Sequence, residues 1–308
     1  MKPRYLDPLL AVFSVFLLLT SLSGSSFGAG SDDQGVREPV LAGTWYPGNP
    51  EKLRDQITGF LSKASGDPLQ GELVGLVAPH AGYMYSGQVA AFAYKLLLGT
   101  SFKRVILIGP SHYVGFRGIA VDLHSGYKTP LDTTPVDKDF LNELLGTNSQ
   151  IRWLPDAFGR EHSLEIQVPF LQTVLKEFTI VPVLMRESDE ITCTTLAEGL
   201  AKTIKKKQGK TLVLASTDLS HFHTGDQAKL LDHRFIETLR AFEPKGLLRS
   251  MSSGECEACG GGPTVAAMLA ARGLGADQAI VLRYANSGDV TGDYKRVVGY
   301  VSAAFVRR

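Results

Sequence analysis

Short apolar runs alternate with longer helix-like stretches along almost the whole chain. Continuous apolar runs of this kind are typical of strands that are buried on both faces of a parallel sheet. We therefore expect an α/β domain with a mainly parallel, mixed central sheet and helices on both faces. The expected strands are Leu73–Ala78, Arg104–Ile108, Phe178–Leu184, Thr211–Ala215, Ala279–Tyr284 and Val297–Phe305. Pro182, in the third run, predicts an edge strand or a strand end.

The stretches between these runs have the length and composition of helices. They are Pro50–Ala64, Gln88–Leu98, Ser163–Lys176, Cys193–Lys207, Gly225–Ala241 and Pro263–Gly273. The segment Ser111–Pro135 is polar, contains several glycines and has no strong period. It predicts a hairpin or an active-site loop. Composition does not change along the body of the chain, so residues 30–308 are predicted to form one domain.

The first 29 residues differ from the rest of the chain. Lys2 and Arg4 precede the apolar stretch Leu9–Leu19, and small residues follow it. This order is typical of a signal peptide. Because Asp7 is unusual in such a segment, an uncleaved N-terminal membrane anchor remains the alternative. We expect a domain that is exported, to a periplasmic or extracellular location, or that is anchored by this segment.

Basic and acidic residues are nearly balanced, with 32 Lys and Arg against 31 Asp and Glu. A surface that binds nucleic acid needs an excess of positive charge to neutralise phosphates. We therefore expect no nucleic-acid partner, and membrane contact only if the N-terminal segment stays uncleaved.

Three of the predicted strands run directly into turns that carry histidine. His80 follows the first strand, His112 follows the second, and Asp218, His221 and His223 follow the fourth. In open α/β sheets, ligands bind beyond the carboxyl ends of the strands, so these side chains are expected to converge on one crevice. Imidazole is the commonest metal-binding side chain. A single histidine in a turn more often bonds locally, but the repeated placement favours a metal site.

Two further residues have alternative interpretations. His162 precedes a predicted helix, where it either caps that helix or acts as a general acid or base beside the pocket. Cys259 precedes three glycines at the start of another helix, where the helix dipole stabilises a thiolate. With Cys256 it forms a C-x-x-C pair, which is either a disulfide, a coincidence or the source of a thiolate ligand. Cys193 leaves the cysteine count odd.

Several ordered motifs together resemble the MEMO family, whose bacterial members are often labelled AmmeMemoRadiSam system protein B. The motifs are AGTWYP, APHAGYMYSG, GPSH, EHSLEIQVPFL, STDLSH and CGGGP, and they extend from about Arg37 to Phe305. The resemblance implies a fold like that of the class III extradiol-type non-haem iron dioxygenases. It also implies a metal site of three histidines and one cysteine. Matched to the motifs, these residues are His80, His112, His221 and Cys259, with Asp218 as a further ligand or a supporting partner.

The resemblance favours a metal-dependent redox enzyme that uses iron or copper, with His162 moving protons. Extradiol dioxygenases bind their metal with two histidines and a carboxylate, so dioxygenase activity does not follow from the fold. A second hypothesis is a non-catalytic module whose pocket binds a peptide or a small molecule. The aromatic residues expected to line that pocket are Trp45, Tyr83, Tyr85 and Tyr113. A zinc hydrolase is the third hypothesis.

Overall fold

The strands form one large mixed sheet and one small hairpin. The computed structural model describes residues 35–66 and 69–308, so the predicted signal peptide or anchor lies outside the described residues. The strands are β1 Glu72–Ala78, β2 Phe102–Pro110, β3 Ile119–Val121, β4 Gly126–Lys128, β5 Thr133–Pro135, β6 Ile151–Trp153, β7 Thr179–Met185, β8 Lys210–Ser216, β9 Asp218–His223, β10 Gln278–Asn286 and β11 Val297–Arg307. Each of the six predicted strands is present.

The strand order in the large sheet is β10-β11-β1-β8-β2-β7-β3-β6, and β9 pairs with β11 beside this path. Strands β1, β8, β2 and β7 are mutually parallel, whereas β11 is antiparallel to β1 and β3 is antiparallel to β7. The parallel strands are buried along most of their length, which explains their continuous apolar sequences. The predicted mixed, mainly parallel sheet is therefore confirmed.

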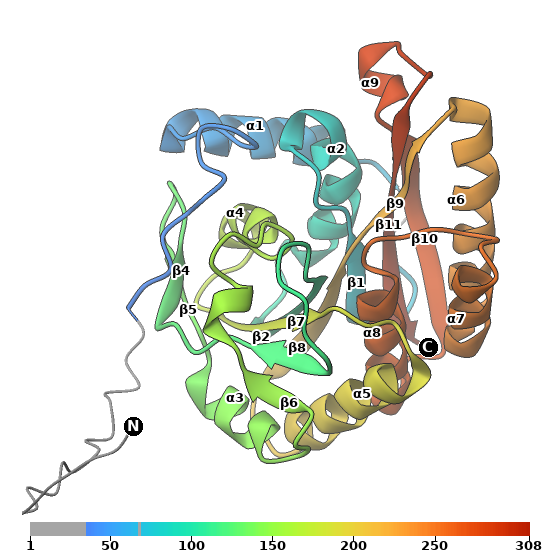
Figure 1. The fold of residues 1–308 in the computed structure, drawn as a ribbon. Helices are drawn as coiled ribbons and strands as arrows, with labels where there is room; N and C mark the ends of the chain where they lie inside the picture. The colour runs from blue at the N-terminus through green and yellow to red at the C-terminus, as the bar shows by residue number, and fades with distance from the viewer. Residues whose placement is uncertain (1–34, 67–68) are drawn as a thin grey trace, which may run out of the picture. The chain divides into compact units, whose positions relative to one another are not determined.

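Helices cover both faces of this sheet (Figure 1). They are α1 Pro50–Lys63, α2 Tyr83–Tyr94, α3 Lys138–Leu145, α4 Val168–Val174, α5 Glu190–Ile204, α6 Gly225–Arg240, α7 Pro244–Ser252, α8 Gly261–Gly273 and α9 Gly288–Thr291, with short 3-10 turns at η1 Lys95–Leu97, η2 Pro155–Ala157 and η3 Glu165–Gln167. Helix α2 packs on β1, β10 and β11, while α8 packs on β1, β2 and β8. No helix in the described ranges is both long enough and apolar enough to cross a membrane.

Two local predictions about strands have different outcomes. The hairpin expected within Ser111–Pro135 is present, because β4 and β5 pair as an antiparallel hairpin. The edge position expected from Pro182 is wrong, since β7 lies between β2 and β3. The carbonyl of Pro182 accepts a hydrogen bond from the Asp122 amide. The backbone nitrogen of Pro182, which carries no hydrogen, therefore faces β3. Its lack of a donor removes no hydrogen bond between β7 and β2.

Other segments differ from the sequence prediction. The helix expected over Ser163–Lys176 is shorter, with η3 followed by α4. The segment containing His221, expected as a turn after β8, forms the separate strand β9, which pairs with β11. Because β1, β8 and β2 are adjacent and parallel, their carboxyl ends lie at one edge of the sheet. That edge carries the histidines.

Candidate metal centre

Three imidazoles form the tightest group of potential metal ligands in the described part of the chain. His80 follows β1, His112 follows β2 and His162 precedes η3. Their potential ligand atoms all lie within 4.8 Å of one another. The rings of His112 and His162 are stacked with centroids 4.2 Å apart, and the His80 ring lies 5.2 Å from that of His112. This group could hold a metal ion, as expected from the strand-end position of His80 and His112.

Cys259 and His221 border the same place. Cys259 Sγ lies 3.1 Å from His80 Nε2. His221 and Cys259 both line a cavity of about 360 Å³, together with Met251 and Cys256. Cys259 therefore lies beside His80, but the compact group of ligand atoms contains His162 and does not include His221.

A buried hydroxyl sets the tautomer of His80. The hydroxyl of Ser216 donates to the carbonyl oxygen of Ser163 at 2.6 Å and accepts from Gln167 Nε2 at 2.7 Å. His80 Nδ1 lies 2.9 Å from the same oxygen. Because the single hydroxyl proton is already used, His80 Nδ1–H must be the donor. The Nε2 of His80 is therefore unprotonated, and its lone pair faces Cys259 Sγ at 3.1 Å.

A buried carboxylate does the same for His112. Glu161 accepts hydrogen bonds from the backbone amide of His112 at 2.7 Å and from its Nδ1 at 2.9 Å. It also accepts from the amides of His162 and Ser163. Burial alone would raise the pKa of Glu161, but these donors outweigh burial and lower the pKa to about 2. The Nδ1–H of His112 is therefore fixed, and its Nε2 is free.

His221 is held by the backbone of its own strand. Its Nδ1 lies 2.7 Å from the carbonyl oxygen of Leu219, which can only accept a hydrogen bond. The Nε2 of His221 is therefore unprotonated as well. His80, His112 and His221 thus share one arrangement, with Nδ1–H bound to an acceptor and the Nε2 lone pair available, which is typical of histidines that bind metal.

His162 lacks this arrangement. Its Nδ1 lies 3.3 Å from the Tyr113 hydroxyl, which can donate or accept, and 3.7 Å from Glu161. The Trp45 ring covers His162 at 4.6 Å between centroids. Burial and the neighbouring His112 lower the pKa of His162 to about 4. His162 is therefore a neutral base at neutral pH, and its proton is not committed to one acceptor.

Burial also favours the neutral forms of His80 and His221. It lowers the pKa of His80 well below its ordinary value, with further contributions from His162 and His112. It also lowers the pKa of His221. Neutral imidazoles are the form that binds metal, so the electrostatics of the pocket suit a cation.

Asp218 and Cys259 have partners inside the protein. Asp218 Oδ1 accepts a hydrogen bond from the His80 amide at 2.8 Å, so this carboxyl group shapes the turn that carries His80. Burial raises the pKa of Asp218 to about 7. Cys259 lies just before α8, as predicted, and its Sγ accepts from the Asp218 amide at 3.3 Å. The expected thiolate stabilisation is wrong for the protein alone, because burial raises the pKa of Cys259.

All three cysteines are free thiols, so the structure contains no Cys256–Cys259 disulfide. Among the expected pocket aromatics, Trp45, Tyr85 and Tyr113 are exposed. Tyr83 is buried, and its hydroxyl donates to the carbonyl of Ile166. The expectation that Tyr83 lines the pocket is therefore wrong.

Sequence reasoning missed the residue that holds Trp45 in place. The carboxylate of Glu165 is buried and accepts hydrogen bonds from Arg37 Nη1 at 2.7 Å, from the Tyr46 hydroxyl at 2.8 Å and from two backbone amides of the N-terminal segment. This network attaches the segment that carries Trp45 beside His162. Glu161, Glu165 and Gln167 all lie in the EHSLEIQ motif. The two acidic residues in this otherwise buried motif are the sequence feature that could have identified the network.

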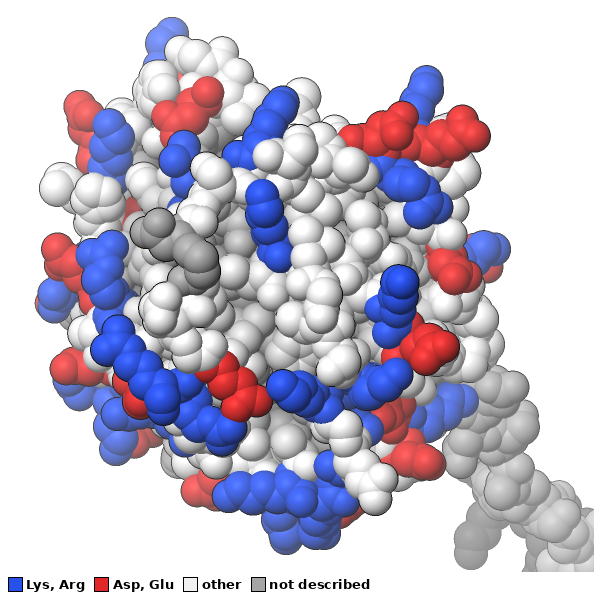
Figure 2. Space-filling view, turned by 180° about the vertical axis from the view of Figure 1, so that it is seen from behind, with Lys and Arg blue, Asp and Glu red and all other residues white. Residues whose placement is uncertain are grey.

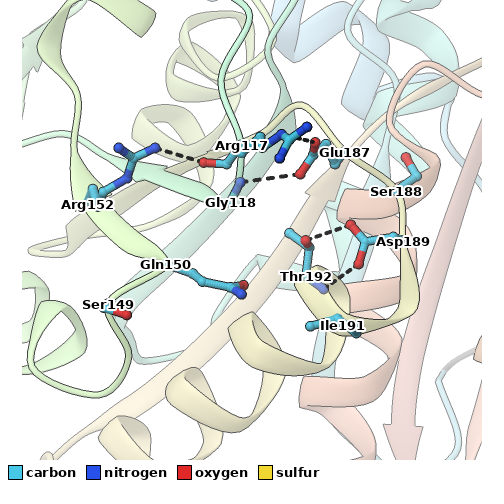
Figure 3. A pocket seen from close by; sticks show the side chains of 10 residues that line it. All are labelled: Arg117, Gly118, Ser149, Gln150, Arg152, Glu187, Ser188, Asp189, Ile191 and Thr192. Atoms are coloured by element: carbon cyan, nitrogen blue, oxygen red, sulfur yellow. Dashed lines mark hydrogen bonds and ion pairs between the residues drawn. The ribbon is translucent and has the colours of Figure 1, made fainter.

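A larger cleft lies away from the histidines. It has a volume of about 790 Å³ and lies between the start of β3, the start of β6 and the start of α5 (Figure 3). Its charged side chains include Arg117 and Arg152, and also Glu187 and Asp189. Ser188 borders both this cleft and the cavity at His221 and Cys259.

Comparisons with known proteins give one consistent result. The family model described as Memo-like protein matches residues 37–304. MEMO1 family protein MK0963 of Methanopyrus kandleri is 37% identical over 283 residues, which cover 88% of this chain and 99% of that protein. A MEMO1 family protein of Sulfolobus acidocaldarius is 38% identical, with the same two coverages.

A solved structure, that of the uncharacterized protein JW3007 from Escherichia coli K12, is only weakly similar. It is 14% identical with a TM-score of 0.46, and the match covers 76% of this chain and 100% of that one. The family model and the curated relatives carry the conclusion, and they confirm the resemblance found in the motifs. The chain belongs to the MEMO family of Memo-like proteins.

Proposed function

We propose that the pocket binds a redox-active metal, iron or copper, and that the protein is a metal-dependent oxidoreductase. His80, His112, His221 and Cys259 are the proposed ligands. The observation that carries this proposal is the shared arrangement of the three histidines, each with Nδ1–H bound to a fixed acceptor. Such acceptors orient a ligand ring and make it more basic.

His162 is proposed as the acid–base residue rather than as a ligand. His162 belongs to the compact group of ligand atoms, but its Nδ1 faces the Tyr113 hydroxyl and no fixed acceptor. Because its pKa is about 4, His162 is already unprotonated at neutral pH. It can therefore accept a proton from a substrate and later return that proton. Trp45 and Tyr113 lie against its ring and exclude water from that side.

The donor set fits a soft or borderline metal. Imidazole nitrogens with one sulfur suit iron, copper and zinc better than magnesium or calcium. When bound, such a metal supplies Lewis acidity and, for iron or copper, one-electron chemistry. Because burial raises the pKa of Cys259, a cation is needed to hold its thiolate form. Asp218 supports the site through the His80 amide.

The same pocket suits two other functions. Trp45 and Tyr113 are exposed beside His162, and Tyr85 is also exposed, which favours a non-catalytic module that binds a peptide or small molecule. Zinc fits the same donors, which keeps a zinc hydrolase as the weaker alternative. Both alternatives predict a protein without redox activity, so one set of measurements separates the three functions.

The test is anaerobic reconstitution of the full chain with Fe(II), Cu(I) and Zn(II), followed by metal analysis and spectroscopy. We expect stoichiometric iron or copper, lost in His80→Ala and Cys259→Ser. His233→Ala is the matched control, because His233 lies exposed on α6 outside this group. A protein that takes up only zinc favours the hydrolase. Failure to take up any of the three metals would contradict the metal site and leave the binding module.

We also propose that residues 1–29 direct export or anchor the protein. The basic start and apolar centre of this segment support the proposal. Cell fractionation with N-terminal sequencing tests it, because a cleaved exported protein begins after this segment and an anchored protein retains it. A full-length protein found in the cytosol would contradict both forms.

A further inference from the structure

Two arginines contact residues next to His112 and have no carboxylate partner. Arg160 and Arg186 are exposed, and neither forms an ion pair with a carboxylate within residues 35–66 and 69–308. Both are nonetheless oriented by neighbouring groups. The proposed metal site does not use these two oriented guanidinium groups.

Arg160 lies on the His162 side of the pocket. Its guanidinium carbon is 5.1 Å from the centre of the Tyr113 ring, in a cation–π contact. The hydroxyl of that same tyrosine lies 3.3 Å from His162 Nδ1. The tyrosine therefore connects the guanidinium to the base at the pocket.

Arg186 contacts the residue that precedes His112. It directly follows β7, and its Nη1 donates to the carbonyl oxygen of Ser111 at 3.3 Å. Ser111 immediately precedes His112, so this guanidinium lies at the base of the turn that carries the histidine. One hydrogen bond leaves most of the five guanidinium N–H donors of Arg186 available.

The nearby acidic groups are already engaged. Glu161 is buried and binds His112 and the following amides. Glu187 lies 4.0 Å from Arg117, and Glu257 pairs with His223 at 2.9 Å. Asp189 caps α5 through Thr192. None of these carboxylates therefore pairs with Arg160 or Arg186.

The large cleft does not share this property. Figure 3 shows Arg117 beside Glu187, and Arg152 bonded to the Arg117 carbonyl. Its two arginines are matched by Glu187 and Asp189, so it offers no net positive site. On the face seen in Figure 2, acidic side chains are likewise interspersed among the basic ones.

We propose that Arg160 and Arg186 recognise the acidic group, carboxylate or phosphate, of a small organic anion whose planar body lies against Trp45 and Tyr113. This inference rests on the proposed function, because it names the substrate class of the same pocket. Guanidinium groups bind carboxylates and phosphates through paired N–H donors, and exposed aromatic rings accept planar groups. Trp45 is 36% exposed and Tyr113 is 49% exposed, so both rings have a free surface.

The experiment uses the full chain, with and without reconstituted iron, and three probes. Benzoate is the organic acid, benzamide is its uncharged match, and inorganic phosphate tests an anion without an aromatic body. Binding is followed by equilibrium dialysis and by tryptophan fluorescence, since Trp45 is one of only two tryptophans. We expect benzoate or phosphate to bind at least about tenfold more tightly than benzamide, as for a hydrogen bond between charged groups.

The variants Arg160→Gln and Arg186→Gln are each expected to weaken binding of the acidic probe about tenfold and to leave benzamide unchanged. Arg160→Lys retains the positive charge but lacks the paired N–H donors of the guanidinium group, so it separates the effect of charge from that of hydrogen-bond geometry. Arg240→Gln is the matched control, because Arg240 is exposed at the end of α6 and forms none of the ion pairs described here. Thermal unfolding of every variant excludes loss of fold.

Preference for benzoate identifies a carboxylate ligand, and preference for phosphate alone identifies a phosphate ligand. Equal binding of benzamide and the acidic probes, or a preference that survives both glutamine substitutions, overturns the inference. An arginine-dependent preference in a protein that takes up no metal supports the anion site and contradicts the proposed metal function. The two failures are therefore distinguishable.

Discussion

Ser216 is the most informative residue to change, because it sets the tautomer of a proposed ligand without touching the metal itself. Its hydroxyl is buried and bonds His80 Nδ1, Gln167 Nε2 and the Ser163 carbonyl. Ser216→Ala leaves His80 Nδ1–H without its acceptor. Gln167 keeps a second bond, at 3.1 Å, to the carbonyl of Pro79, so the loss falls mainly on His80 and Ser163.

The size of the expected effect follows from the hydrogen-bonding groups that Ser216→Ala leaves without a partner. A buried donor or acceptor without a partner costs about 1–3 kcal/mol, so we expect a fall in the free energy of unfolding of roughly that size. His80 also becomes free to carry its proton on Nε2, where it would donate to the Cys259 sulfur. Loss of a group that orients a ligand lowers metal affinity about 10- to 100-fold, or about 1.4–2.8 kcal/mol.

The assay is metal competition titration together with urea unfolding, on Ser216→Ala and on Ser302→Ala. Ser302 is an equally buried serine in β11, and its hydroxyl has no hydrogen-bond partner in the described structure. Ser302→Ala therefore removes the same hydroxyl oxygen without removing a hydrogen bond. If Ser216→Ala binds metal as tightly as Ser302→Ala does, the hydroxyl does not set the tautomer of His80 and the reasoning fails.

Three further predictions concern charge and redox state. Glu165→Gln leaves Arg37 buried without its counterion and should lower the free energy of unfolding by about 3–5 kcal/mol, measured by urea denaturation; an unchanged midpoint would show that the pair is dispensable. The pKa of His162 is about 4 in the folded protein and 6.5 ordinarily, so the folded state holds this side chain neutral. The contribution of His162 to stability is therefore complete above pH 6.5 and is lost as the pH falls through 4. Between pH 7 and pH 4, the melting temperature of the metal-free protein should therefore fall less steeply in His162→Gln than in the parent. Cys256→Ser should keep metal uptake after mild thiol oxidation, whereas the parent loses uptake if a Cys256–Cys259 disulfide forms; equal loss in both proteins would refute pairing.

Much of the fold could be predicted because its signal is local. The apolar runs at Leu73–Ala78 and Thr211–Ala215 are long enough to read as buried strands, and both became central parallel strands. Strands β3 and β6 have three residues each, which is too short for a pattern to show. The strand β9 is polar, and it exists because β11 offers a pairing edge.

The sequence by itself determined that His80 and His112 meet, because two parallel strands must deliver their ends to one edge of the sheet. Family motifs added Cys259, which the structure places 3.1 Å from His80. Only the tertiary structure decided how each imidazole is used. The acceptors of His80 and His112 lie 136 and 49 residues away along the chain, so no local pattern could identify Ser216 or Glu161 as the groups that orient them.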